Sequence, residues 1–229
     1  MTELNGAEYN AVLFDLDGTL VDTAPDMVAV LHYLQREYGI DPVPYELGRS
    51  YVSNGAIGLL TLGFPELEIE YGDELHLQFL ERYAETICDE SRVFAGLSEL
   101  LDQLDDMGCP WGVVTNKPEN LTVPLLIALE LADRSACMVS GDTLAVRKPD
   151  PAPLLLACDF VGVDPEKSIY IGDAERDIEA GQRAGMATIA AGYGYITADD
   201  DPREWDADVI ATTAEELAQI VLKAVNLEA

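Results

Sequence analysis

The sequence predicts an α/β protein, a parallel sheet wrapped in helices, with an all-helical segment inserted after the first strand. Three observations predict this. Short apolar runs rich in strand-forming residues alternate with amphipathic helical patterns through most of the chain. Residues 23–92 break the alternation and carry helical patterns only. The 229 residues, 48% of them hydrophobic, are enough to bury a substantial core.

Six short apolar runs are typical of buried strands, and polar or glycine-containing turns follow them. They are Ala11–Phe14, Trp111–Val114, Met138–Val139, Ser168–Ile171, Ala187–Ala190 and Val209–Ala211. Between the later runs, apolar residues recur at helical spacing, as at Leu97, Leu100, Leu101 and Leu104. Because strand and helix alternate, we expect the sheet to be parallel.

The inserted segment shows two helical patterns. They are Met27, Val30, Leu31, Leu34 and Tyr38, and then Leu75, Phe79, Leu80 and Tyr83. An insert at this place can cover the strand ends without disturbing the sheet. We therefore expect a core domain of residues 1–22 and 93–229 and a helical cap domain of residues 23–92.

The charge of the chain excludes several functions. Its 43 acidic and 13 basic residues leave a formal net charge of −30, and long-range repulsion then argues against binding to nucleic acids or anionic membranes. A site for an anionic ligand must concentrate positive charge from a metal and a few cations. Because few of the basic residues are lysines, we hypothesise that the acidic surface reflects salt adaptation.

The cysteines and the N-terminal residues point to a cytoplasmic protein. The four cysteines form no C-x-x-C motif, which predicts neither a zinc site nor a redox site, and free thiols fit a reducing compartment. The first ten residues are acidic and polar, and no run of about 18 apolar residues occurs. We expect a soluble chain, and its oligomeric state is left open.

Charged, hydroxyl and amide side chains follow several of the predicted strands or open the helices after them. These residues are Asp15, Asp17, Thr115, Asn116, Lys148, Asp173 and Asp177. In a parallel α/β sheet the carboxyl ends of the strands are where ligands bind. Their joint occurrence is stronger evidence for a site than any one of them.

The first strand leads into two carboxylates. Alternation along an extended strand places Asp15 and Asp17 on the same side. Hydrolysis of a phosphate monoester needs a nucleophile for phosphorus and an acid for the leaving oxygen, and two carboxyl groups in different environments can share these roles. Gly18 permits a tight bend near the phosphate.

Carboxylates approach a phosphate dianion only when positive charge intervenes. A magnesium ion bound by Asp15 and Asp173 would supply that charge, and Lys148 would add a second. The Thr115 side chain and the backbone N–H of Asn116 would hold the transferring oxygens. The residues thus predict a phosphoryl-transfer site that contains Mg²⁺.

Each of these residues also has a structural interpretation. An Asp-x-Asp-Gly run occurs in turns and calcium loops, and a lysine before proline is commonly a solvated loop residue. Asp177 lies at a helix start, where it would orient Lys148 or a metal-bound water, or, with Asp173, simply cap the helix. Taken together, the residues favour the functional interpretation.

Four motifs in order resemble those of the haloacid-dehalogenase-like hydrolase superfamily and span nearly the whole chain. They are D-L-D-G-T-L (15–20), V-V-T-N (113–116), R-K-P-D-P (147–151) and G-D-A-E-R-D (172–177). The helical segment after the first motif resembles the family's cap. The resemblance implies a Rossmann-like core, an aspartyl-phosphate intermediate and Mg²⁺ as cofactor.

The resemblance also implies a role for each matching residue. Asp15 resembles the nucleophile and Asp17 the acid/base, while the Asp15 carboxylate, the Asp17 backbone carbonyl and Asp173 resemble the magnesium ligands. Thr115 and Lys148 match the phosphate binders. Asp17 argues against the dehalogenase branch, whose members lack the second acid. Phosphomutases of the family retain that acid, so phosphomutase activity is a further alternative.

The substrate is narrowed by shorter stretches. V-S-N-G-A (52–56) and G-Y-G-Y (192–195) resemble phosphoglycolate phosphatases, whereas F-A-G-L-S-E-L-L and W-G-V-V-T-N-K-P resemble N-acetylmuramic acid 6-phosphate phosphatases of peptidoglycan recycling. We expect 2-phosphoglycolate, with the amino-sugar ester as the alternative. Both are small phosphorylated metabolites with a carboxylate, for which Arg49 is the candidate cap partner; Asn54 and Gly55 are further cap candidates.

A phosphate-accepting receiver domain of a signalling protein is an alternative from a different class. It also combines an acceptor aspartate, a threonine and a lysine on a parallel α/β sheet. The helical insert and Asp17 count against it, because Asp17 would serve to hydrolyse an acyl phosphate rather than preserve it.

Overall fold

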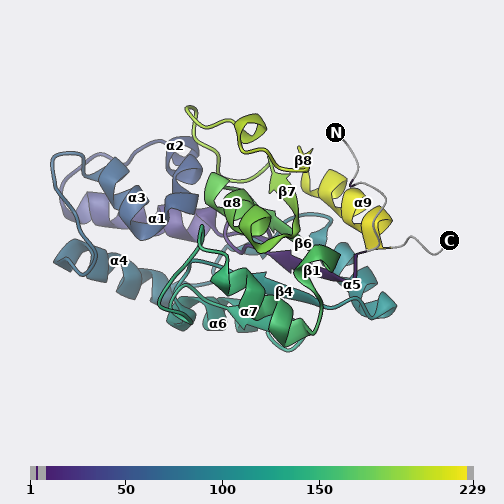
Figure 1. The fold of residues 1–229 in the computed structure, drawn as a ribbon. Coiled ribbons are helices and arrows are strands. Elements are labelled where there is room, and N and C mark those ends of the chain that lie inside the picture. Colours follow the sequence, from purple (N-terminus) through teal and green to yellow (C-terminus); the bar gives the residue numbers. More distant parts are fainter. Residues whose placement is uncertain (1–3, 5–8, 226–229) are drawn as a thin grey trace.

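A six-stranded parallel sheet forms the centre of the larger lobe in the computed structural model, which describes Leu4 and residues 9–225 (Figure 1). The strand order is β5-β4-β1-β6-β7-β8. The strands are β1 (Ala11–Phe14), β4 (Trp111–Val114), β5 (Cys137–Val139), β6 (Ser168–Gly172), β7 (Ala187–Ala191) and β8 (Val209–Ala211). Each matches a predicted run within one residue at either end, which confirms the α/β fold class.

Side-chain alternation along the strands gives the sheet two apolar faces. In β1, Val12 and Phe14 belong to one buried cluster and Leu13 to another. The first cluster is completed by α5 (Leu97–Met107), α6 (Glu119–Ala128) and α9 (Ala214–Val225), and the second by α7 (Ala152–Val161) and α8 (Glu175–Ala184). Strands that are buried on both faces appear in a sequence as continuous apolar runs, so their positions could be predicted closely.

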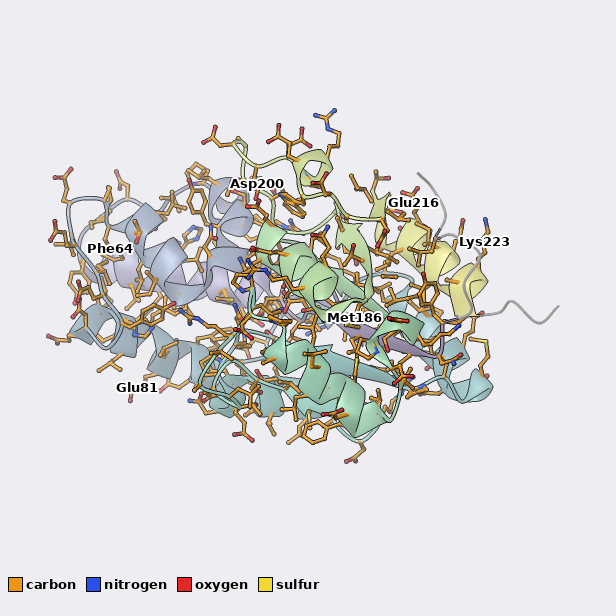
Figure 2. The ribbon with its side chains drawn as sticks, viewed as in Figure 1. Phe64, Glu81, Met186, Asp200, Glu216 and Lys223 are labelled. Carbon is orange, nitrogen blue, oxygen red and sulfur yellow. The ribbon has the colours of Figure 1, made fainter. Side chains whose placement is uncertain are left out.

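The smaller lobe is helical and has an apolar cluster of its own. Its helices are α1 (Ala24–Glu37), α2 (Tyr45–Ser50), α3 (Gly55–Gly63) and α4 (Glu74–Glu85), with a 3₁₀ turn at Val52–Asn54. Phe64 lies in this cluster and Met186 in the core lobe (Figure 2). We propose that residues 23–92 are the cap domain that the sequence predicts.

A two-stranded antiparallel sheet joins the lobes where the chain leaves the core and returns. It pairs β2 (Val21–Asp22) with β3 (Arg92–Val93), each too short to produce a periodic pattern in the sequence. Nearby, the Asp26 carboxylate accepts hydrogen bonds from the backbone N–H groups of Glu90 (2.9 Å) and Ser91 (2.8 Å) and from the Ser91 hydroxyl (2.6 Å). The start of α1 is therefore fastened to the segment that returns to the core.

Acidic side chains lie on the surface of both lobes. Glu81 on α4 and Asp200 in the loop before β8 are both exposed (Figure 2). Among the described residues, no helix has the length and apolar character needed to span a membrane.

Candidate active site

The carboxyl ends of β1 and β4 open onto a cavity of about 500 Å³ that the cap covers. Seven of the predicted site residues line it, namely Asp15, Asp17, Asn54, Gly55, Thr115, Asn116 and Lys148. Two more, Asp173 and Asp177, are fully buried beside Asp15. The strand ends thus bring together side chains that are more than 100 residues apart in the sequence.

A buried cluster of three carboxylates lies next to this cavity. One oxygen each from Asp15, Asp173 and Asp177 lies within 4.8 Å of the others. Oδ2 of Asp173 accepts hydrogen bonds from the Ser53 hydroxyl (2.6 Å) and the Tyr195 backbone N–H (2.8 Å), whereas its Oδ1 is buried without a hydrogen-bond partner among the described residues. Burial, with repulsion from Asp15 and Asp177, raises the pKa of Asp173 to about 7.

These groups fit a hard divalent cation. Mg²⁺ prefers carboxylate oxygens and keeps several waters, and it would partner the free oxygen of Asp173 and offset the charge of the cluster. The third carboxylate of the cluster is Asp177. The third magnesium ligand predicted from the sequence is instead the backbone carbonyl of Asp17. Asp177 Oδ1 is 2.7 Å from Lys148 Nζ, and its Oδ2 accepts a hydrogen bond from the Ala174 N–H at 3.1 Å, so Asp177 both contacts the lysine and caps α8.

Lys148 is the buried cation of the cluster. Its Nζ lies 2.9 Å from Asp15 Oδ1 and donates to the Val114 carbonyl at 2.9 Å. The Asn116 side chain holds the lysine backbone from both sides, since its amide donates to the Lys148 carbonyl and its carbonyl accepts from the Lys148 N–H, each at 3.1 Å. Asn116 therefore positions Lys148, a role that the sequence did not predict.

Gly18 is required by close packing against the carboxylate cluster. Its φ is +81°, and a Cβ at this position would lie 2.1 Å from Asp173 Oδ2. Only glycine fits both the backbone conformation and the space. The bend that the sequence predicted thus brings the backbone against Asp173.

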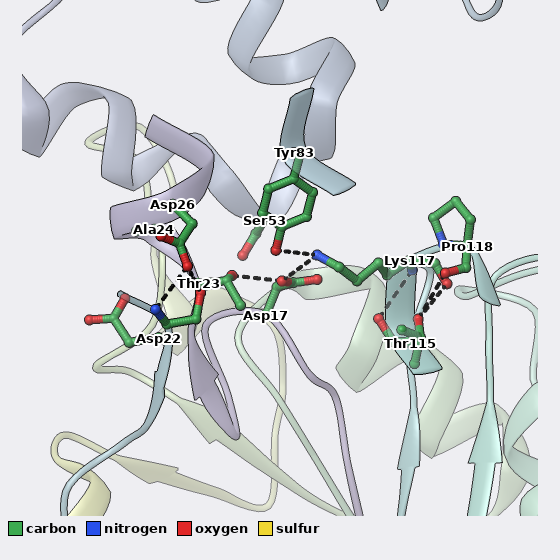
Figure 3. Close-up of polar contacts among 12 residues, drawn as sticks. Asp17, Asp22, Thr23, Ala24, Asp26, Ser53, Tyr83, Thr115, Lys117 and Pro118 are labelled. Carbon is green, nitrogen blue, oxygen red and sulfur yellow. Dashed lines mark hydrogen bonds and ion pairs between the residues drawn. The ribbon is translucent and has the colours of Figure 1, made fainter. Parts of the chain in front are cut away.

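Asp17 has two hydrogen-bond donors, and the sequence predicted neither. The Thr23 hydroxyl lies 2.6 Å and Lys117 Nζ 2.9 Å from Asp17 Oδ1 (Figure 3). The Lys117 ammonium also donates to the hydroxyl of Tyr83, on cap helix α4, at 3.0 Å. Lys117 directly follows the Thr115-Asn116 pair in the sequence, so its position was the signal available for finding it.

The cap also contacts the core beside the metal cluster. Ser53, in the 3₁₀ turn, binds Asp173 through its hydroxyl, and its carbonyl accepts a hydrogen bond from Arg176 at 2.8 Å. Asn54 and Gly55 follow in the chain and line the cavity, as the sequence suggested. Residues 52–56 therefore line the cavity, and the substrate contacts expected of Asn54 and Gly55 stay predictions, whereas the contacts with Asp173 and Arg176 come from Ser53.

Arg49 is not among the residues that line the cavity. Its guanidinium lies over the Tyr195 ring, 4.7 Å from the centroid, and contacts Asp22 Oδ1 at 3.8 Å and the Gly194 carbonyl at 3.5 Å. These contacts tie α2 to the core outside the cavity. The geometry does not favour the predicted contact between Arg49 and a substrate carboxylate.

Four cationic side chains line the cavity. Lys117 and Lys148 are paired with carboxylates, and Arg176 donates to a cap carbonyl. Arg147 makes no ion pair with any described residue and lies against the ring of Tyr71, 5.5 Å from its centroid. Arg147 is thus the lining cation most available to an anionic group of a ligand.

The cap side of the cavity is mostly apolar and aromatic. Its larger side chains are Met27, Tyr71, His76, Phe79, Leu80 and Tyr83. His76 accepts a hydrogen bond from the Gly72 N–H at Nδ1 (3.1 Å), and burial lowers its pKa. A neutral imidazole and aromatic rings suit contact with the carbon skeleton of a ligand.

Comparison with known proteins identifies the family. Residues 12–191 match the sequence profile described as haloacid dehalogenase-like hydrolase. The chain belongs to the haloacid dehalogenase-like hydrolase family. The match runs from β1 to the end of β7 and includes all four motifs and the helical lobe.

Individual members of the family resemble the chain over most of its length. A phosphoglycolate phosphatase of Xanthomonas campestris is 43% identical over 90% of this chain and 94% of its own. An N-acetylmuramic acid 6-phosphate phosphatase of Pseudomonas aeruginosa is 43% identical over 93% and 95%. The crystal structure of a predicted phosphoglycolate phosphatase from Haemophilus somnus superposes with a TM-score of 0.82 at 28% identity and covers 95% of this chain and all of that one.

Proposed function

We propose that this chain is a magnesium-dependent phosphatase that hydrolyses a small, carboxylate-bearing phosphate monoester through an aspartyl-phosphate on Asp15. The observation that carries the proposal is the grouping of Asp15, Asp173 and Lys148 beside a cavity that also contains Asp17. A nucleophile, a second acid and compensating positive charge at one strand-end site are what phosphoryl transfer requires. Both named phosphatase relatives support it.

In the first step the Asp15 carboxylate attacks phosphorus while the ester oxygen leaves. The new bond joins a carboxylate oxygen to phosphorus, the ester bond breaks, and Asp17 donates its proton to the leaving oxygen. Lys148, the Thr115 hydroxyl and the Asn116 N–H would hold the phosphoryl oxygens. Magnesium held by Asp15, Asp173 and the Asp17 carbonyl would supply positive charge against the phosphate.

In the second step water attacks the aspartyl-phosphate. Asp17, now ionised, takes the proton from the water, and the bond between phosphorus and Asp15 breaks to release inorganic phosphate. Both carboxyl groups return to their starting states. The cap would exclude other water from the cavity during the first step.

The two named relatives suggest two esters as substrate, 2-phosphoglycolate and N-acetylmuramic acid 6-phosphate. In the sequence, the motif at residues 52–56 favours 2-phosphoglycolate. The cavity favours the larger ester, because about 500 Å³ with an aromatic wall lies within the range of roughly 300 to 1,000 Å³ that holds drug-sized ligands. Phosphoglycolate would fill only a small part of it.

We also propose that the reaction takes place in the cytoplasm. The four cysteines, Cys88, Cys109, Cys137 and Cys158, are free thiols, which supports a reducing compartment.

The test is phosphate release from 2-phosphoglycolate, N-acetylmuramic acid 6-phosphate, sugar phosphates and pyrophosphate, with Mg²⁺ or with EDTA. We expect Mg²⁺-dependent release, and Asp15→Asn should reduce it by a factor on the order of 10⁴ or more. Equal activity of Asp15→Asn would overturn the mechanism. Transfer of phosphate between sugar positions without net release would indicate a mutase, and a stable phosphoprotein without turnover would indicate a receiver.

A further inference from the structure

A buried lysine connects the second acid of the core to the cap. Lys117 is 8% exposed, and its Nζ lies 2.9 Å from Asp17 Oδ1 and 3.0 Å from the Tyr83 hydroxyl (Figure 3). The same ammonium lies 4.5 Å from the centroid of the Tyr83 ring. Tyr83 is 1% exposed and belongs to α4. Lys117 therefore binds one side chain from each lobe, Asp17 from the core and Tyr83 from the cap.

The charge on Lys117 is stable near neutral pH. Burial alone would lower the pKa of the ammonium, but the Asp17 carboxylate and the Tyr83 phenol outweigh burial and raise the pKa of Lys117 above its usual value. Burial also raises the pKa of Tyr83 to about 12, so that the phenol stays neutral. The Lys117 ammonium therefore donates charge-assisted hydrogen bonds to Asp17 Oδ1 and to the neutral Tyr83 hydroxyl. Charge-assisted hydrogen bonds are stronger than those between neutral groups.

Both donors to Asp17 reach the same oxygen. Thr23 and Lys117 bind Oδ1, and no described residue donates a hydrogen bond to Oδ2. Because Asp17 lines the cavity, Oδ2 is the oxygen left for a ligand. Fixing one carboxylate oxygen with two donors removes the rotational freedom of the other, as proton transfer to a positioned leaving group requires.

We propose that Lys117 and Tyr83 are positioning residues for the acid/base step: Lys117 fixes Asp17 so that Oδ2 faces the leaving oxygen, and Tyr83 holds Lys117 in place. The inference rests on the proposed phosphatase function, in which Asp17 is the acid. It makes proton transfer depend on the seating of the cap, because the hydroxyl that holds Lys117 comes from α4. A closed cap is then needed for chemistry as well as for excluding water.

Comparing kcat/KM for substrates with different leaving groups separates a positioning role from a merely structural one, which would lower both values equally. An alkyl oxygen needs a proton as it leaves, whereas p-nitrophenolate leaves without one. Lys117→Met should lower kcat/KM about 100-fold for whichever alkyl phosphate the wild type hydrolyses best, within the range of general acid catalysis. For p-nitrophenyl phosphate, kcat/KM should fall by less than about 5-fold, because this ratio reports the first step only.

Tyr83→Phe is the milder variant, since it keeps the ring and removes the hydroxyl. We expect a fall of about 5- to 10-fold for the alkyl ester, consistent with the loss of one hydrogen bond to a charged group, and no change for p-nitrophenyl phosphate. Tyr33→Phe is the matched control, because Tyr33 is a cap tyrosine outside the cavity and 42% exposed. It should behave as wild type with both substrates.

A double-mutant cycle tests whether Tyr83 acts through Lys117. In the Lys117→Met background, Tyr83→Phe should have almost no further effect, whereas independent roles would multiply. Equal loss with both substrates would overturn the proposal, and so would independent effects in the cycle. If Lys117→Met does not fold, the leaving-group dependence of Tyr83→Phe decides alone. A wild type that releases no phosphate from any ester would instead defeat the proposed function.

Discussion

The two walls of the cavity are built in opposite ways. On the core wall most charged groups have charged or polar partners, as Lys148 does with Asp15 and Asp177. On the cap wall the large side chains are aromatic or aliphatic, and few make polar contacts. The core wall therefore suits the chemistry at phosphorus, and the cap wall suits the choice of ester.

Asp173→Asn acts on the core wall and should have the largest effect. In EDTA the variant should unfold at a higher temperature than wild type, because it removes one of three buried carboxylates packed together. With Mg²⁺ at 100 times its Kd the wild type should gain about 2.7 kcal/mol and the variant much less, so the order reverses. Thermal unfolding of both proteins in EDTA and in Mg²⁺ checks this.

Asp41→Asn is the control for this prediction, since Asp41 is exposed in the cap. It should follow the wild type in both buffers. Equal stabilisation of wild type and Asp173→Asn by Mg²⁺ would show that Asp173 does not bind the metal.

Arg147→Gln tests the unpaired cation of the cavity and should have an intermediate effect. If Arg147 binds the substrate carboxylate, its loss should raise KM about 10-fold, the equivalent of a charged hydrogen bond. KM for p-nitrophenyl phosphate, which has no carboxylate, should stay the same. Arg49→Gln should not raise KM for either ester, because Arg49 lies outside the cavity lining. The reverse result would restore the role that the sequence predicted for Arg49.

Salt should have the smallest effect, and it should act on the surface rather than on either wall. The net charge of −30 destabilises the folded chain through repulsion among exposed acids, which KCl screens. We expect the melting temperature to rise by about 2 °C between 0.1 and 2 M KCl, which is roughly 1 kcal/mol for a chain of this size. An unchanged melting temperature would contradict the hypothesis of salt adaptation.

Much of the core wall could be predicted from the sequence because two local rules locate many of its residues. Buried strands appear as apolar runs, and ligand-binding residues follow the carboxyl ends of parallel strands. Asp15, Thr115 and Asp173 were all found in this way. No knowledge of packing between distant segments was needed, because the parallel sheet itself brings the strand ends together.

The cap wall could not be predicted to the same depth, because its contacts depend on how one lobe sits on the other. Ser53 lies inside a motif that the sequence singled out, yet its partner Asp173 is 120 residues away. The six residues of α2 are too few to fix which side of the helix faces the cavity, so position alone did not show that Arg49 lies outside the cavity lining. Lys117 was overlooked because its partners come from both lobes.

The two-stranded sheet that joins the lobes also bears on how such enzymes diversify. β2 and β3 run side by side where the chain crosses between the lobes, and Asp26 on α1 fastens the returning segment next to them. The hydrogen bonds of Asp26 lie wholly within residues 23–92, whereas β2 and Val93 of the sheet lie in the core segments. In a recombination between relatives, a gene fragment encoding residues 23–92 would transfer a new cap wall together with the hydrogen bonds of Asp26 that hold its two ends. The strand ends that perform the chemistry would keep their original sequence.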